Sequence, residues 1–164
     1  MMSWHLGAMP ESAGSRVYPG AEGKHPMHNR FQLLLRLQDF RRRMRRWQRI
    51  DRTATGDANT AAEVCAALRN LALVASQEGF GAFSSLCLRL AERAEPWQRQ
   101  HAVPASALGQ LDTWMEAAER CMRQPSNRFL AARLVQQLNA VEWQIALSER
   151  EREAFISEMV DQIA

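Results

Sequence analysis

Apolar residues recur with the period of an α-helix along most of this chain, and no segment is convincing as a β-strand. The clearest stretch begins at Arg30, where large apolar side chains return every three or four residues and arginines occupy many of the other positions. Its apolar positions are Phe31, Leu34, Leu35, Phe40, Met44 and Trp47. We therefore predict a first helix from about Arg30 to Arg52, followed by a linker from Thr53 to Gly56.

Capping residues, glycine and proline divide most of the remaining chain into further helices. These helices are predicted from Asp57 or Asn59 to about Glu78, from about Ala82 to Glu95, from about Ala107 to Gln124, and from about Asn127 to Trp143. The boundaries depend on Gly79 as a helix-ending glycine, on Pro96 and Pro125 as stops, and on Ser106 as a cap.

The last predicted helix has its own start signal. Ser148 is followed three residues later by Glu151, which is the spacing of a capping box. Its apolar face comprises Ala154, Phe155, Met159, Val160 and Ile163. We expect this helix and the one before it to pack as a cap on the preceding helices or to form an interface.

These elements predict an all-α protein. Four helices of bundle length joined by short loops favour an antiparallel four-helix bundle at residues 29–124, with two additional helices in a C-terminal extension at residues 125–164. Residues 1–28 contain several glycines and prolines with no sustained period, and we predict a disordered leader there. Met27 lies just before the first helical pattern and is a candidate start, in which case residues 1–26 are not translated.

The positive charge of the chain is concentrated in the first predicted helix. The formal net charge of the 164 residues is +3, but residues 30–52 hold nine arginines against two aspartates, a net charge of +7, which leaves −4 for the remainder. The densest cluster is Arg41, Arg42, Arg43, Arg45, Arg46 and Arg49. Such a cluster attracts an acidic protein, nucleic acid or an anionic lipid surface, or it is a solvated helix exterior balanced by acidic residues of later helices. Phe40 and Trp47 are candidate stacking partners for a nucleic acid.

Patterns that carry catalysis or bind metals are missing from the sequence. There is no glycine-rich phosphate loop, no G-x-S-x-G, no H-E-x-x-H and no C-x-x-C. Cys65, Cys87 and Cys121 are widely spaced, and we expect reduced thiols packed as small hydrophobic groups in a cytoplasmic protein. No apolar run is long enough to span a membrane. We therefore expect a protein that is not an enzyme and that needs no cofactor or metal ion.

The stretch from Arg69 to Glu92, RNLALVASQEGFGAFSSLCLRLAE, keeps the spacing of a known signalling motif. It resembles the histidine-phosphotransfer (HPt) family, whose motif is roughly H-x-L-K-G-x-A-x-x-L-G-x-x-x-L-x-x-L-C-x-x-L. The matching positions are Leu71, Ala75, Gly79, Phe83, Leu86, Cys87 and Leu90. The reactive part of the motif is changed: Arg69 stands at the phosphorylated histidine, Ala72 at the lysine and Leu73 at the first glycine.

Helical geometry bears on Arg69 independently of the motif. At about 100° per residue, Val64, Leu68, Leu71 and Ala75 form one buried stripe, and Arg69 lies roughly 130° away on the exposed side. A guanidinium stays protonated and is not a nucleophile, so no phosphorelay runs through this position. The neighbours predicted on the same face are Ala62, Cys65, Ala66, Ala72, Leu73 and Ser76. This face either docks a protein or is covered by the N-terminal segment or the tail helices.

The resemblance implies an inactive phosphotransfer-like domain in two-component or chemosensory signalling. We expect a non-catalytic adaptor whose partner, a receiver domain, a histidine kinase or a chemosensory component, docks on Arg69, Leu73, Ala66, Ala72 and Ser76. The alternative is a basic helical protein that binds nucleic acid through the arginines of the first helix. A third option is an interaction subunit whose tail helices form a homodimer.

Overall fold

The computed structural model describes residues 26–50, 58–124, 126–139 and 142–161, and the regular structure in these ranges is helical, without a strand. The helices are α1 (Pro26–Ile50), α2 (Ala58–Gln77), α3 (Gly81–Gln100), α4 (Ala105–Arg123), α5 (Arg128–Gln137) and α6 (Glu149–Asp161). The predicted all-α class is therefore confirmed. Helix α1 begins at Pro26, inside the predicted leader and four residues before the predicted start, so that boundary is wrong; proline is favoured in the first turn of a helix. Residues 1–25 and the linker from Thr53 to Gly56 lie outside the described residues.

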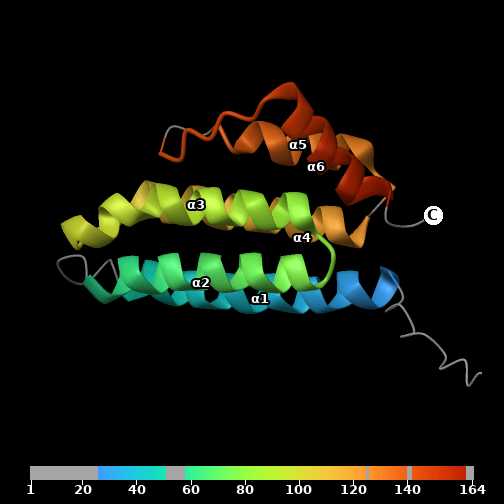
Figure 1. The fold of residues 1–164 in the computed structure, drawn as a ribbon. Coiled ribbons are helices and arrows are strands. Elements are labelled where there is room, and N and C mark those ends of the chain that lie inside the picture. The colour runs from blue at the N-terminus through green and yellow to red at the C-terminus, as the bar shows by residue number, and fades with distance from the viewer. Residues whose placement is uncertain (1–25, 51–57, 125, 140–141, 162–164) are drawn as a thin grey trace, which may run out of the picture.

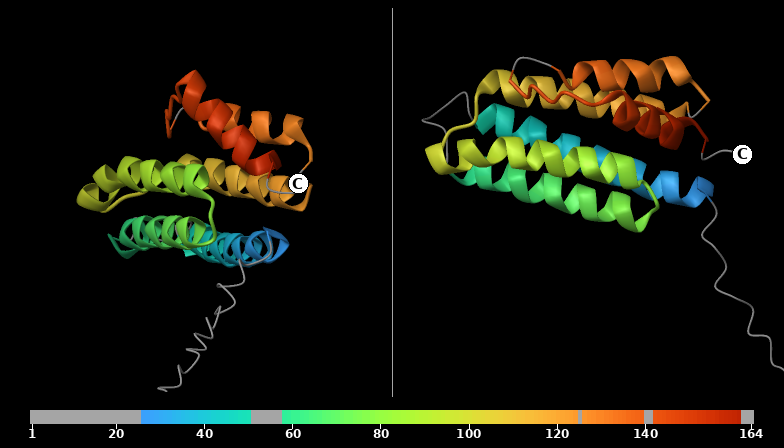
Figure 2. Two further views of the ribbon diagram at one scale, coloured as in Figure 1. Left: turned by 45° about the vertical axis from the view of Figure 1, so that its right-hand side comes forward. Right: turned by 45° about the horizontal axis from the view of Figure 1, so that its top comes forward.

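The helices lie in three layers of two, as Figures 1 and 2 show. Helices α1 and α2 form one outer layer, α3 and α4 the middle layer, and α5 and α6 the other outer layer. Helix α2 packs on α3 and α1 on α4, while α5 packs on α4 and α6 on α3. The tail helices thus cap the middle layer, as predicted, and none of the described helices covers the outer face of α1 and α2.

Aromatic side chains connect the layers through the core. Phe83 of α3 stacks on Trp114 of α4 at 5.7 Å between ring centroids and on Phe155 of α6 at 6.4 Å. All three rings are almost completely buried. Burying a side chain of this size stabilises the folded state by roughly 1.5–3 kcal/mol, so this cluster is a major source of cohesion between the middle layer and the tail.

Helix α2 ends where the sequence predicts. Gly79 adopts a positive φ of 89°, a conformation that costs glycine little because it has no Cβ. The Phe80 N–H donates to the Ala75 carbonyl at 2.8 Å, so the chain closes the helix end as in a Schellman motif.

Two predicted helix ends are wrong. Helix α3 continues through Pro96 to Gln100 and ends at His101, which has a left-handed φ of 53°. The proline ring removes one backbone hydrogen bond of the helix, which destabilises the last turn. The edge-on contact of Trp97 with Trp143, at 4.9 Å between ring centroids, offsets this loss. Helix α5 ends at Gln137, not at Trp143, because the chain turns back and Trp143 Nε1 donates to the Ala107 carbonyl of α4 at 3.1 Å.

The start of α4 also differs from the prediction. The helix begins at Ala105 directly after Pro104, and no side chain caps it. Ser106, the predicted cap, instead donates its hydroxyl to Glu142 Oε1 at 2.8 Å. Asn127 does cap α5, because its side-chain oxygen accepts from the Leu130 N–H at 3.3 Å.

Helix α6 opens with the predicted capping box. The Ser148 N–H donates to Glu151 Oε2 at 2.8 Å, and the Glu151 N–H donates to Ser148 Oγ at 3.2 Å. Its buried face contains Phe155 and Met159 as predicted and also Ile156, whereas Ala154 is exposed. Ile163 lies outside the described residues.

Residues near the end of α6 form hydrogen bonds with the N-terminal parts of α1 and α3. Glu158 accepts hydrogen bonds from the N–H groups of Ala82 and Phe83, each at 2.8 Å, in the first turn of α3, where Phe80 supplies no side-chain cap. Arg30 of α1 is 5% exposed and donates through Nη2 to the Met159 carbonyl at 2.7 Å. The Glu158 carboxylate thus satisfies helix donors that a local capping residue usually satisfies.

The first prediction concerns the titration of Glu158. Burial raises the pKa of this carboxyl, although the hydrogen bonds from the backbone of Ala82, Phe83 and Gly81 oppose the shift. The folded state therefore binds the proton more tightly than the unfolded state, and the contribution of Glu158 to stability falls as pH rises through its folded pKa. Relative to Glu158→Gln, the wild type should lose stability as the pH rises above about 4.3, the ordinary pKa of a glutamate carboxyl.

Urea unfolding of both proteins at several pH values measures this difference. Carboxyl groups shared by the two proteins cancel in the comparison. A difference that stays constant with pH, or that moves in favour of the wild type as pH rises, would contradict the prediction.

Candidate functional site

The exposed face of α2 brings together most of the residues predicted to dock a partner. The Arg69 side chain is 51% exposed, and Leu73 is 57% exposed. Ala66 and Ser76 are exposed on the same helix, about one turn to either side. Arg69, Leu73, Ala66 and Ser76 therefore share a surface that solvent reaches.

Ala72 and Cys65 do not belong to this surface. Each is only 1% exposed, because both face α3. The Ala72 carbonyl accepts from Ser84 Oγ at 2.7 Å, and the Cys65 thiol lies 3.9 Å from the Ala91 carbonyl. The prediction assumed one buried stripe, but α2 has neighbours on two sides, α1 and α3, and each neighbour buries a stripe of its own.

Arg69 pairs with Glu95 of α3 at 2.6 Å, across the contact between the two helices. Both side chains are about half exposed, and such a pair contributes about 1 kcal/mol or less to stability. The pair borders a hollow with a volume of about 460 Å³. Its lining residues are Ala62, Arg69, Glu95, Gln98, Arg99 and His101. Sequence patterns could not place His101 beside Arg69, because they predicted that this helix ends before Pro96.

The tail helices leave the α2 face open. Helix α5 packs on α4, and α6 packs on α3 and α5, on the side of the middle layer that faces away from α2 (Figures 1 and 2). Of the alternatives left open by the sequence, cover by the tail helices is therefore excluded. Residues 1–25, the other predicted cover, lie outside the described residues.

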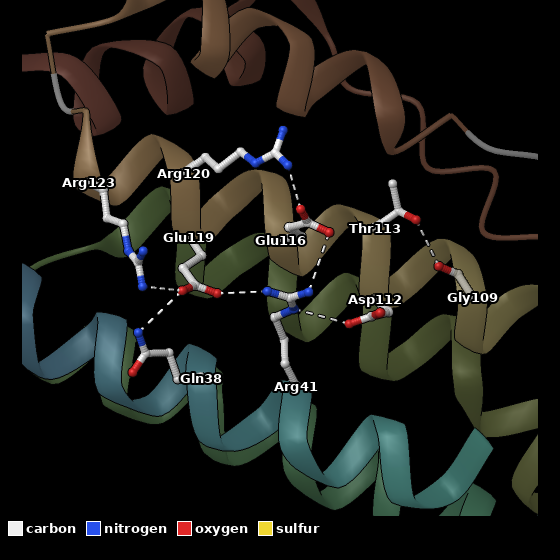
Figure 3. A network of polar contacts seen from close by, with 9 residues as sticks. All are labelled: Gln38, Arg41, Gly109, Asp112, Thr113, Glu116, Glu119, Arg120 and Arg123. Atoms are coloured by element: carbon white, nitrogen blue, oxygen red, sulfur yellow. Dashed lines mark hydrogen bonds and ion pairs between the residues drawn. The ribbon is translucent and has the colours of Figure 1, made fainter. Parts of the chain in front are cut away.

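Arg41 is an exception among the arginines predicted to form a basic patch. Its side chain is 14% exposed and lies between α1 and α4 (Figure 3). Its guanidinium is 3.1 Å from Asp112, 2.9 Å from Glu119 and 3.4 Å from Glu116. Glu119 also accepts from Gln38 at 3.2 Å and from Arg123 at 2.6 Å. Arg41 thus holds two helices together and is not available to an anionic partner.

The Arg41 network shifts the pKa of Arg41 and the pKa of Glu119 in the directions expected for a stable ion pair. Burial alone raises the pKa of the Glu119 carboxyl, but hydrogen bonds from Arg41 and Gln38 and the charge of Arg123 outweigh it, so that the pKa is lowered. Burial likewise lowers the pKa of Arg41, but its hydrogen bonds to Glu119 and Asp112 raise it overall. Both groups are therefore ionised at neutral pH.

The other arginines of the cluster are exposed. Arg43 pairs with Asp39 at 3.3 Å. Arg42, Arg45, Arg46 and Arg49 make no ion pair with any described residue. Three of the exposed arginines, Arg42, Arg43 and Arg46, line a groove of about 750 Å³ between α1 and α2. It is lined by Asp39, Arg42, Arg43, Arg46, Trp47, Glu63, Ala66, Ala67 and Asn70.

Phe40 and Trp47 are wrongly predicted as stacking partners. They are 4% and 3% exposed, and their rings pack edge to face in the core. Trp47 also donates its indole N–H to Glu63 of α2. No base of a nucleic acid can stack on either ring without unfolding α1.

The cysteines are packed as the sequence predicted. Cys65, Cys87 and Cys121 are free and buried. Burial raises the pKa of all three thiols, that of Cys121 to about 11 despite the opposing charge of Arg30. These thiols are therefore protonated at neutral pH and are poor nucleophiles.

The described part of the chain has neither a candidate metal-binding cluster nor a membrane-spanning helix. It holds no group of three His, Cys, Asp or Glu side chains that could bind a metal ion. None of its helices is both long and apolar enough to cross a membrane.

The second prediction compares two neighbouring arginines. Arg41→Ala leaves three carboxylates between α1 and α4 without their shared cation, and it should lower the free energy of unfolding by about 2 kcal/mol. Arg42→Ala removes an exposed side chain with no ion pair to the described residues and should cost less than about 0.5 kcal/mol. Urea unfolding followed by circular dichroism measures both. Equal losses for the two variants would show that the network contributes nothing specific.

Comparison with known proteins identifies no relative of this chain: no family model, no curated protein and no solved structure matches it.

Proposed function

We propose that this chain is a non-catalytic signalling adaptor, in which α1 to α4 form a degenerate HPt-like four-helix bundle. Its partner would be a receiver domain, a histidine kinase or a chemosensory component, docked on Arg69, Leu73, Ala66 and Ser76. The observation that carries the proposal is the exposed Arg69 at the motif position of the phosphorylated histidine, with Leu73 exposed one turn further along the helix.

Leu73 supports a docking role through its exposure. A leucine that is 57% exposed gains little from folding, whereas burial against a partner stabilises the complex by up to a few kcal/mol. Ala66 and Ser76 are small, so they do not hold a partner's backbone away from the helix. Arginine is enriched among the residues that contribute most to interfaces, and the Glu95 carboxylate orients Arg69 before a partner arrives.

The chemistry of the face supports binding without phosphoryl transfer. A guanidinium group is not a nucleophile, so the Arg69 side chain cannot attack phosphorus. His101 lines the same hollow from the end of α3, but it has a left-handed backbone and is not on the motif helix. The proposal therefore assigns recognition, and no reaction, to this surface.

A second candidate function is nucleic-acid binding through α1. The observation that favours it is the set of exposed arginines, Arg42, Arg45, Arg46 and Arg49, which have no acidic partner among the described residues. Because Phe40 and Trp47 are buried, such binding would rely on phosphate contacts alone. It would then be insensitive to base sequence and steeply weakened by salt.

The third prediction tests the docking face. Wild type, Arg69→Glu and Leu73→Asp are used to recover proteins from nuclease-treated bacterial lysate at moderate salt. We expect the wild type to recover a receiver domain or histidine kinase, and the variants to lose it, because one reverses the charge and the other places a carboxylate in an apolar contact. Phe129→Asp is the matched control, since Phe129 is 72% exposed on α5, which packs on α4 and α6 and not on α2.

Purified partner then gives the affinity, which should fall at least about tenfold in both variants and remain unchanged in the control. The docking role of this face is wrong if both variants bind as the wild type does. Recovery of nucleic acid alone before nuclease treatment would favour the second candidate function. Transfer of labelled phosphate from a phosphorylated receiver to this chain would overturn its non-catalytic character.

A further inference from the structure

Helix α1 carries a second exposed surface, which adjoins the α2 face at the groove that Arg42, Arg46 and Ala66 line. Its members, which we call the α1 outer stripe, are Phe31, Leu35, Arg42, Arg45, Arg46 and Arg49. At about 100° per residue they fall within an arc of roughly 100°, and they extend over about 27 Å of helix. Helix α1 itself lies in an outer layer of the molecule, away from α5 and α6 (Figures 1 and 2).

The stripe is divided along its length. Its first part is apolar: Phe31 is 56% exposed and Leu35, one turn later, is 43% exposed. Its second part consists of arginines that have no ion pair with described residues, whereas Asp39 is occupied by Arg43 at 3.3 Å. Arg42 and Arg46 stand four residues apart, and like charges at this spacing destabilise a helix by a few tenths of a kcal/mol.

The packing of α1 does not require either part. The buried face of the helix supplies Leu33, Leu37 and Met44 to the core, each fully buried. Arg41 makes the polar contact with α4. The apolar and basic side chains of the outer stripe therefore contribute little to the stability of the fold. Burial of the apolar side chains and pairing of the arginines with carboxylates would both stabilise a complex with a partner.

We propose that the α1 outer stripe binds an acidic amphipathic helix of a partner protein. The partner's apolar side chains would cover Phe31 and Leu35, and its carboxylates would lie over the arginines. A helix of about 18 residues matches the length of the stripe. This inference goes beyond the proposed adaptor function, because it concerns a different helix and a partner surface of defined charge and polarity.

Charge complementarity and the order of the side chains favour this occupant over a membrane or a nucleic acid. A helix that lies in a membrane interface has apolar residues along its whole buried face, whereas here arginines occupy half of that face. Phosphates of a nucleic acid would follow the arginines but would leave Phe31 and Leu35 exposed. A partner helix with one apolar part and one acidic part satisfies the whole stripe.

A second copy of the chain does not complement the stripe. In a twofold-symmetric contact the same patch meets itself. A parallel pairing of two copies places arginines against arginines, and an antiparallel pairing places arginines against Phe31 and Leu35. Neither arrangement supplies carboxylates to the four arginines.

The experiment is a selection of helical peptides on the full chain. A displayed library of 18-residue helix-forming peptides is selected on the wild type, and the enriched peptides are synthesised and titrated by fluorescence anisotropy. We expect enriched sequences to combine acidic residues in one half with apolar residues in the other. Their affinity should fall at least about tenfold for Arg42→Glu with Arg46→Glu, and also for Phe31→Ser with Leu35→Ser.

Matched controls use exposed side chains elsewhere in the fold. Phe129→Ser removes an aromatic ring that is 72% exposed on α5, and Arg133→Glu with Arg150→Glu reverses two exposed charges on the tail helices. Both controls should leave peptide affinity unchanged. The milder Arg42→Gln with Arg46→Gln, whose helicity is checked by circular dichroism, separates loss of binding from loss of folding.

Several results would overturn the proposal. One is that no peptide is enriched, or that the enriched peptides lack acidic residues or bind the stripe variants as well as the wild type. Tighter binding of phosphatidylserine vesicles or duplex DNA than of any selected peptide, lost in the stripe variants, would assign the stripe to another class of ligand. Concentration-dependent dimers that disappear in those variants would assign it to a second copy.

Discussion

The middle layer of this protein is packed on both of its faces, and the rest of the arrangement follows from that constraint. Helices α3 and α4 meet α2 and α1 on one side and α6 and α5 on the other. Phe83 lies at the centre, where it stacks on a ring from its own layer and on one from α6. Because α3 and α4 bury two faces, their sequences are rich in buried apolar residues, and the outer helices are free to be polar or apolar on the side that faces solvent.

Helices α1 and α2 differ in the side chains that they expose to solvent. Helix α2 presents small residues, one leucine and one arginine, and that arginine is already paired with α3. Helix α1 presents two large apolar side chains followed by arginines without acidic partners among the described residues. Arg41 directly precedes Arg42 in the sequence, but it lies about 100° further around the helix. Its side chain therefore packs between α1 and α4. Neighbours in a run of identical residues thus lie in opposite environments, one between two helices and the others exposed to solvent.

Local patterns predicted what depends on local physics. The helical period identified the all-α class, Gly79 marked a helix end, and Ser148 with Glu151 marked a helix start, since each of these signals acts within about four residues. What failed depends on contacts between distant segments. Pro96 did not stop α3 because Trp97 meets Trp143, and Ala72 is buried because α2 has two neighbours. The role of Arg41 could not be predicted without knowing that α4 brings three carboxylates to it.

The contact between Glu158 and the first turn of α3 has a consequence for how this protein opens. Two amide groups near the middle of the chain are protected by a carboxylate 75 and 76 residues further along it. If α6 detaches, those amides lose their acceptor at the same moment that Arg30 loses the Met159 carbonyl. Fraying of the last helix is therefore felt at the starts of α1 and α3, so these three segments open as one cooperative unit although they are far apart in sequence.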